Sequence, residues 1–421
     1  MAKNWFKCAG SFFHGPSRCL PVNILFVGQT HSVHFARLAA NLERLLPDSL
    51  KQSLTLYLLN SYPFPCASCV DADHFSFRIL QYQLGSDVHA DDPLSDGQES
   101  IESFMIGEGR SIRRPSEQAL DGFARDLKQA GIDIIWLADL QTAGYLYLDH
   151  LAERVGRAPK LVLTTYGNDL FLFQHSLAHL GKIRALLERV DCLQCETMRD
   201  VDIAQRLGYG GEWFCDLTSS FDTAAGFPFV EPGPDPGFSM ALTGSDVRKS
   251  PRRVLLEMAD PNGTLGHGAR DWIDGVHLIR ATRADRDLAN LYTACLPPLR
   301  ASGWLSTEDL YATLRESTVY VHDTISDGIA VTCVEAALSA ALPITTRCNA
   351  YHELLNPEAR DLTIVPDPYD EAHGFLRRIE RIHQLSADDR VQLARGIQRD
   401  VLRILETDHV QQRLLRLLAL A

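Results

Sequence analysis

Residues 319–346 have the pattern of a strand, a loop, a helix and a second strand, which is the repeating unit of a parallel α/β fold. The segment reads VYVHDTISDGIAVTCVEAALSAALPITT; it opens on β-branched and aromatic residues, and Ser326-Asp327-Gly328 is typical of a turn. Residues 333–340 favour a helix, and Pro343 follows before the second strand. Such a unit directs the first N–H groups of its helix toward the end of the first strand. We therefore predict an anion site at that end.

Two acidic residues flank the predicted anion site. Asp327 lies in the loop, and Glu335 follows eight positions later in the helix. Carboxylates accept hydrogen bonds from hydroxyls, so one acid can contact a sugar and the other a ribose. For Glu335 an alternative stays open, because Thr332-x-x-Glu335 is also a capping box in which the acid only satisfies the start of the helix.

The first half of the chain alternates strand-like runs with amphipathic helical segments. The runs lie at 22–27, 54–59, 132–137, 161–165 and 191–195. This alternation predicts a parallel sheet with helices on both faces. Residues 85–117 are polar and poorly periodic, which predicts a long loop or a plain insertion.

The chain divides at a cluster of proline and glycine, GFPFVEPGPDP at 226–236, which neither a helix nor a strand tolerates. A second alternating unit begins with a run at 253–258, and apolar residues at helical spacing close the chain. The 421 residues, 45% of them hydrophobic, are enough for two cores. We expect a first Rossmann-like domain at 1–225, a linker at 226–252, a second Rossmann-like domain at 253–400 and a terminal helix at 401–421.

Composition excludes several classes of protein. A net charge of −13 disfavours nucleic-acid binding, because an acidic surface repels phosphates. No apolar run approaches the ~20 residues of a membrane span, and the run at 22–27 is too short for a signal sequence, so we expect a cytoplasmic protein. Basic helical positions at Arg377, Arg378 and Arg381 leave weak peripheral contact with the inner face of the membrane open.

The ten cysteines predict reduced thiols rather than disulfides or a metal site. Cys66-Ala-Ser-Cys69 and Cys192-Leu-Gln-Cys195 have the spacing of metal ligands. Neither pair has a histidine in zinc-finger register, and the second falls in a predicted strand. We therefore expect no metal.

Several blocks together resemble one family. SDGIAVTCVEA resembles the acid-x7-acid signature of glycosyltransferase family 4, with Asp327 in place of the usual Glu, as in one bacterial branch of that family. Three further blocks follow in the family's order: IWLADLQTAGY at 135–145, LTTYGNDLFLF at 163–173 and DCLQCETMRDVDIAQRLGY at 191–209. With 22–42 and 317–355 they cover about half of the chain. The resemblance implies the GT-B fold, two Rossmann-like parallel-sheet domains that face a central cleft.

The resemblance also implies an activity. Family members are retaining enzymes that move a sugar from a nucleotide-sugar donor to an acceptor without a metal or another cofactor. We expect transfer to a glycan or lipid-linked acceptor in polysaccharide biosynthesis. A transfer-inactive binding or scaffold protein is the alternative, and an epimerase or hydrolase is a third reading, for which His31 is the hint.

By the same resemblance, each domain contributes residues to the site. The implied catalytic residues are Asp327, Glu335, Asp169 and His31. The implied donor-binding residues are Gly28, Gly328, Ile329, Ala330 and Glu335, and Arg248, Lys249 and Arg253 are available substitutes for the basic residue that family members use to hold the diphosphate. For each of these residues a role without ligand contact stays open: His31 can be structural, Asp169 can belong to a turn, and the basic residues can be solvated.

Two departures from the family pattern weaken the expected donor binding. The family places Lys or Arg near the end of the first strand of the donor domain, where this chain has Glu257 in the run at 253–258. A carboxylate there repels a diphosphate. The family's Asn-Gly-Gly element is also replaced, around Thr218-Ser219-Ser220. Both departures favour the transfer-inactive alternative.

Overall fold

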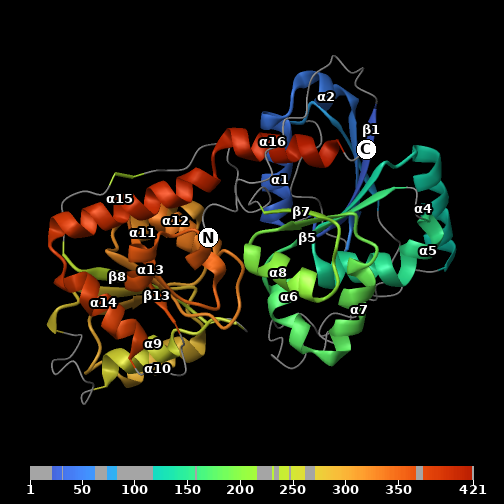
Figure 1. The fold of residues 1–421 in the computed structure, drawn as a ribbon. Helices are drawn as coiled ribbons and strands as arrows, with labels where there is room; N and C mark the ends of the chain where they lie inside the picture. Colours follow the sequence, from blue (N-terminus) through green and yellow to red (C-terminus); the bar gives the residue numbers. More distant parts are fainter. Residues whose placement is uncertain are drawn as a thin grey trace. The chain divides into compact units, whose positions relative to one another are not determined.

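A computed structural model describes residues 21–30, 32–61, 74–82, 117–156, 159–215, 230–231, 237–245, 248–260, 271–366 and 373–419. The chain forms two compact units (Figure 1). Unit 1 comprises Met1–Gly226 and Leu405–Ala421, and unit 2 comprises Phe227–Ile404. Each unit is an α/β structure with its own sheet.

Unit 1 contains a seven-stranded parallel sheet in the order β3-β2-β1-β4-β5-β6-β7. Its strands are β1 Val22–Gly28, β2 Leu54–Asn60, β3 Arg78–Tyr82, β4 Ile134–Leu137, β5 Lys160–Thr165, β6 Cys192–Cys195 and β7 Glu212–Cys215. Its helices are α1 Val33–Leu45, α2 Asp48–Ser53, α4 Glu117–Ala130, α5 Ala152–Val155, α6 Asn168–Phe171, α7 Leu177–Leu187, α8 Met198–Arg206 and α16 Thr407–Leu418. Short π-helical and 3₁₀ turns, η2 Leu140–Gly144, η3 Tyr147–Leu151 and η4 Phe173–His175, connect them.

Two hydrophobic clusters cover the opposite faces of this sheet. Alternation along β1 places Ile24 in one cluster and Leu25 in the other. α16 lies beside α1 (Figure 1), and its residues Val410 and Leu414 belong to the same cluster as Ile24. The C-terminal helix therefore completes the core of unit 1.

Cys192 and Cys195 occupy the two ends of β6 and belong to different clusters. A separation of three residues in a strand directs side chains to opposite faces, so this pair cannot share a metal ion. No group of His, Cys, Asp and Glu side chains within the described ranges is arranged to hold a metal. Cys66 and Cys69 lie outside those ranges.

Unit 2 contains a six-stranded parallel sheet in the order β10-β9-β8-β11-β12-β13. Its strands are β8 Ser239–Thr243, β9 Gly275–Ile279, β10 Leu299–Ala301, β11 Val319–His322, β12 Leu342–Thr346 and β13 Ile364–Val365. Its helices are α9 Arg252–Ala259, α10 Arg283–Leu291, α11 Thr307–Arg315, α12 Val331–Leu338, α13 Pro357–Thr363, α14 Gly374–Gln384 and α15 Ala387–Ile404, with a 3₁₀ turn η7 at Ala350–Glu353.

The strand order of both sheets reverses direction once, which marks where a ligand is expected. In unit 2 the chain runs outward from β8 through β9 to β10, then returns to the other side of β8 with β11, β12 and β13. This is the Rossmann order 3-2-1-4-5-6, and open α/β sheets bind ligands beyond the carboxyl ends of the strands at the reversal. The corresponding points are β8 and β11 in unit 2 and β1 and β4 in unit 1.

Three expectations about the second unit were wrong. The strand β8 lies at Ser239–Thr243, inside the range 226–252 expected to be a linker. The run at 253–258 belongs to α9 and not to a strand, because Leu, Glu, Met and Ala favour a helix and the apolar residues occupy one buried face. The boundary expected at 400/401 falls inside α15, which continues to Ile404.

Among the described residues, no helix combines the length and apolar character needed to cross a bilayer. The basic positions on α14 interact within the fold. Arg378 is buried and donates to the carbonyl of Ile364 at 2.8 Å, and Arg381 forms an ion pair with Asp361 at 2.6 Å. These two side chains give peripheral membrane contact no support.

Candidate functional site

The loops that follow β8 and β11 are tied together at the reversal point of the second sheet. Lys249 forms an antiparallel bridge with Thr324, and the backbone N–H of Ile325 donates to the carbonyl of Arg248 at 3.0 Å. The loop after the first strand of unit 2 therefore presents two adjacent basic residues next to the loop that carries Asp327.

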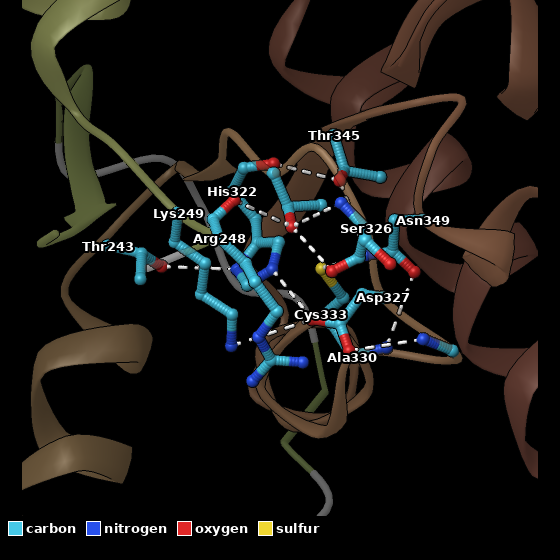
Figure 2. Close-up of polar contacts among 12 residues, drawn as sticks. Thr243, Arg248, Lys249, His322, Ser326, Asp327, Ala330, Cys333, Thr345 and Asn349 are labelled. Carbon is cyan, nitrogen blue, oxygen red and sulfur yellow. Dashed lines mark hydrogen bonds and ion pairs between the residues drawn. The ribbon is translucent and has the colours of Figure 1, made fainter. Parts of the chain in front are cut away.

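The carboxylate of Asp327 is the centre of this arrangement. Its Oδ2 lies 3.5 Å from Nζ of Lys249 and 3.3 Å from Nε2 of His322, and the side chain is 14% exposed. Figure 2 shows Lys249 and Arg248 extending from one loop toward this carboxylate. Burial by itself raises the pKa of the Asp327 carboxyl. The positive charge of Lys249 and the hydrogen bond with His322 outweigh burial, so the pKa lies well below its usual range and the group is ionised.

Helix α12 begins at Val331, four residues after Asp327, and its first turn has backbone N–H groups that no helical carbonyl can accept from. Its N-cap is Ala330, whose side chain supplies no capping hydrogen bond. Buried Asn349 holds this cap, because its Oδ1 accepts from the N–H of Ala330 at 3.3 Å. Among the described residues, the N–H groups of Val331 and Thr332 have no acceptor. These two donors suit an anion.

The capping-box alternative for Glu335 is wrong. The helix begins at Val331, so Thr332 lies inside its first turn and is not the N-cap. Glu335 lies one turn further along and is buried, with 6% of its surface exposed. Glu335 therefore does not act as the capping residue of α12.

The loop residues Gly328 and Ile329 act through their backbone. The N–H of Gly328 donates to Oδ1 of Asp327 at 3.1 Å, and its carbonyl accepts from the N–H of Ala350 at 2.9 Å. The side chain of Ile329 is buried. These contacts hold the turn between Asp327 and α12 in one conformation.

Arg253 and Glu257 do not belong to this arrangement. Nη2 of Arg253 lies 3.2 Å from Oδ1 of Asp323, and its guanidinium stacks on Phe375. Glu257 accepts hydrogen bonds from the N–H groups of Phe375 and Leu376 at 3.1 and 3.0 Å, at the start of α14. The expectation that Glu257 lies near the end of the first strand of unit 2 was wrong, because that strand is β8 and Glu257 lies in α9.

Sequence reasoning missed an exposed aromatic residue at the same edge of the sheet. Trp304 follows β10 and is 81% exposed, and the guanidinium of Arg280, which follows β9, lies 3.9 Å from the centre of its ring. The N–H of Arg280 donates to the carbonyl of Gly303 at 3.2 Å, which ties the two loops together. A tryptophan after a short strand was the available signal.

In unit 1, Gly28 ends β1 at the reversal point. A Cβ atom on Gly28 would lie 2.5 Å from Cβ of Ala138, which is too close for a side chain. Only glycine therefore allows β1 and the segment after β4 to pack at this distance. His31 lies outside the described residues.

Asp169 lies in α6, just beyond the end of β5, and is 8% exposed. Its Oδ2 accepts from the N–H of Tyr166 at 3.1 Å, a local contact like the one that the turn alternative expects. Burial, followed by the negative charge of Asp139, raises the pKa of Asp169 to about 7. A carboxyl with such a pKa can exchange a proton near neutral pH.

Comparison with solved structures identifies the fold. The chain is similar to a sucrose-phosphate synthase from Thermosynechococcus elongatus, with 14% identity and a TM-score of 0.64 over 94% of this chain and 98% of that one. It is also similar to a trehalose-6-phosphate protein from E. coli bound with UDP-2-fluoro glucose, with 13% identity and a TM-score of 0.62 over 94% and 98%. A third is Anabaena HepE in complex with UDP and glucose, with 10% identity and a TM-score of 0.56 over 94% and 99%.

These similarities extend over nearly the whole chain, and they define a protein of the GT-B fold, the fold of nucleotide-sugar glycosyltransferases. The predicted fold class is confirmed. No family model matches the sequence, and no curated protein matches it.

Proposed function

We propose that the chain is a glycosyltransferase whose unit 2 binds a nucleotide-sugar donor and transfers the sugar, with retention, to a glycan or lipid-linked acceptor. One observation carries the proposal: the basic loop after β8 and the acidic loop before α12 meet at the reversal point of a Rossmann-like sheet. Positive charge and free helix N–H groups suit a diphosphate, and the neighbouring carboxylate suits sugar hydroxyls.

The diphosphate is assigned to the side chains of Arg248 and Lys249 and to the N–H groups at the start of α12. Lys249 pairs with Asp327, so binding requires that the ammonium shift toward the phosphates and share its charge between two anions. During transfer the leaving nucleoside diphosphate gains negative charge, and donors already held in position stabilise that charge.

The two acids are assigned to different parts of the donor. Ionised Asp327 accepts a hydrogen bond from a hydroxyl of the transferred sugar, and buried Glu335 accepts from the ribose. Trp304, stacked on one face by Arg280, offers its other face to a nucleobase, because an aromatic plane with 81% exposure can stack with a second ring.

Unit 1 is assigned to the acceptor. The pKa of Asp169, raised by burial to about 7, allows this carboxyl to orient an acceptor hydroxyl or to take its proton. Glu257, a reason to expect a transfer-inactive protein, satisfies the start of α14 and does not oppose donor binding. The replaced Asn-Gly-Gly element, another reason for the inactive alternative, falls at Thr218-Ser219-Ser220, outside the described residues.

The test has two stages. Thermal unfolding is first measured with UDP, GDP and ADP and with UDP-glucose, GDP-mannose and ADP-glucose; a bound ligand must raise the midpoint by mass action. Nucleoside diphosphate release from the best donor is then followed with and without a mixture of glycan acceptors. Acceptor-dependent release supports transfer, and binding without release under any condition supports the inactive alternative. Glu335→Gln should weaken donor binding without the loss of stability that a capping residue would show.

A further inference from the structure

The buried side chain of His322 is not explained by packing alone. It is the last residue of β11, and 1% of its surface is exposed. A buried imidazole needs hydrogen-bond partners, and here they lie on both sides of the ring. Nε2 lies 3.3 Å from Oδ2 of Asp327, and Nδ1 lies 3.2 Å from the hydroxyl of Tyr320 and 3.3 Å from Oγ1 of Thr243 (Figure 2 shows the contacts with Asp327 and Thr243).

These partners define which ring nitrogen carries hydrogen toward Asp327. Asp327 is ionised and can only accept, so Nε2 of His322 must donate. The hydroxyls of Tyr320 and Thr243 also hydrogen-bond to each other, and either one of them can donate to Nδ1 of the same ring. In addition, Oγ1 of Thr345 donates to the carbonyl of His322 at 2.8 Å, which fixes the backbone from which the ring extends.

Lys249 and His322, the two side chains that contact Oδ2 of Asp327, differ in conformational freedom. Lys249 reaches it with a long side chain that is 17% exposed, whereas His322 reaches it from inside the sheet with a ring that cannot turn without breaking its other contacts. A diphosphate competes with Asp327 for the ammonium of Lys249, because both are anions. The ring of His322 is buried, so we expect a diphosphate not to compete for its N–H.

We propose that His322 is a positioning residue that orients the Asp327 carboxylate toward the donor sugar and keeps it an acceptor when Lys249 moves to the diphosphate. The proposal rests on the donor site proposed above. His322 does not contact the ligand itself; it acts through Asp327, as an outer residue orients the group that makes the contact.

The proposal separates two parts of the binding energy. His322 should matter for recognition of the sugar and not for recognition of the nucleotide, because Asp327 contacts only the sugar. The measured quantity is therefore the ratio of the Kd of a nucleoside diphosphate to the Kd of its sugar conjugate, by calorimetry. UDP and UDP-glucose, GDP and GDP-mannose, and ADP and ADP-glucose are the probes.

Two variants are compared. His322→Phe keeps the volume and removes both nitrogens, and His322→Gln keeps one N–H donor within reach of Asp327. We expect His322→Phe to lower the ratio about tenfold, as expected for loss of a well-positioned hydrogen bond to a charged group, with the Kd of the nucleotide alone unchanged. His322→Gln should restore part of the ratio.

A pH series tests whether the effect passes through the carboxylate. The titratable groups around it are Lys249 and Arg248 from the loop after β8, Tyr320 on β11 and Cys333 on α12. Loss of the hydrogen bond from His322 makes Asp327 easier to protonate. As the pH is lowered from about 7 to about 4, the ratio should therefore begin to fall at a higher pH in His322→Phe than in the wild type, in which the pKa of Asp327 lies well below its usual range and the carboxyl stays ionised.

The outcomes are separable. If the wild type binds none of the six probes, the donor site fails and the inference fails with it. If the wild type prefers the sugar conjugate and His322→Phe keeps that preference, the inference is overturned while the donor site stands. In case His322→Phe does not fold, the cycle of His322→Gln with Asp327→Asn decides: with Asp327→Asn present, the histidine substitution should change the ratio no further, and independent effects would overturn the proposal.

Discussion

The ammonium group of Lys249 lies 3.5 Å from the carboxylate of Asp327, although the two residues follow different strands of the second sheet. Because β8 and β11 are adjacent and parallel, the loops at their carboxyl ends are brought together. A basic and an acidic residue thus converge at the place where an open α/β sheet binds its ligand.

Lys249→Ala should weaken binding of nucleoside diphosphates about tenfold or more, because hydrogen bonds to charged groups contribute roughly 1.5–3 kcal/mol. Calorimetry with the best-binding nucleotide measures the change. Lys160→Ala is the matched control, since Lys160 also pairs with an aspartate but is half exposed in unit 1. If Lys249→Ala bound nucleoside diphosphates as tightly as the wild type does, the assignment of the diphosphate to this loop would be wrong.

Trp304→Ala should also weaken nucleotide binding about tenfold, since stacking of a base on an aromatic side chain contributes roughly 1–3 kcal/mol. Trp304→Phe should retain most of the affinity because it keeps an aromatic face. Leu291→Ala, which removes an apolar side chain that is 74% exposed on α10, serves as the control. The assignment of the base would be abandoned if Trp304→Ala bound nucleotides and inorganic pyrophosphate as the wild type does.

Glu257→Ala should destabilise the protein and leave its nucleotide response intact. The substitution removes the acceptor of two buried N–H groups at the start of α14, which costs about 1–3 kcal/mol. Urea unfolding measures the loss, with Glu308→Ala on the exposed side of α11 as the control. A gain in nucleotide affinity in Glu257→Ala would instead mean that this carboxylate repels the donor.

Asp169 predicts a specific dependence of stability on pH. Burial raises its pKa in the folded protein to about 7 from an ordinary value of 3.8, so the folded state holds the proton more tightly than the unfolded state. The stability that this proton contributes is present below about pH 4, declines as the pH rises and is lost above about pH 7.

Asp169→Asn removes this titration. Relative to the wild type, its free energy of unfolding should rise between about pH 4 and pH 7 by on the order of a few kcal/mol, because one pKa unit corresponds to about 1.4 kcal/mol. Urea unfolding at several pH values measures the difference, with exposed Asp202→Asn on α8 as the control. A difference that stays constant across this range would contradict the raised pKa.

Local sequence patterns were enough to predict many of the strands and helices. The runs around β1, β2, β5 and β11 and the helix at α12 were predictable, because a buried parallel strand is apolar throughout and a helix former is recognisable without its neighbours. The strand β8 was not predicted. It spans five residues, SMALT, and follows a cluster of proline and glycine that obscures its start.

Some residues of the candidate site could likewise be predicted from the sequence, and others could not. The acidic residues before and within α12 were found from their spacing, because both belong to one continuous segment. Which side chain meets Asp327 depended on the pairing of β8 with β11, so Lys249 was one of several basic residues and His322 was missed. Glu257 was assigned to the wrong place because the run at 253–258 was expected to be a strand, whereas it forms part of helix α9.

The sequence by itself determined that this chain forms parallel α/β sheets and carries two acids around a helix start, because strand, turn and helix preferences act over a few neighbouring residues. Only the tertiary structure decided that Lys249 and His322 converge on Asp327, that Glu257 caps α14 and that Trp304 lies on the same edge as the basic loop. These relationships depend on the order of strands in the sheet, which long-range packing decides.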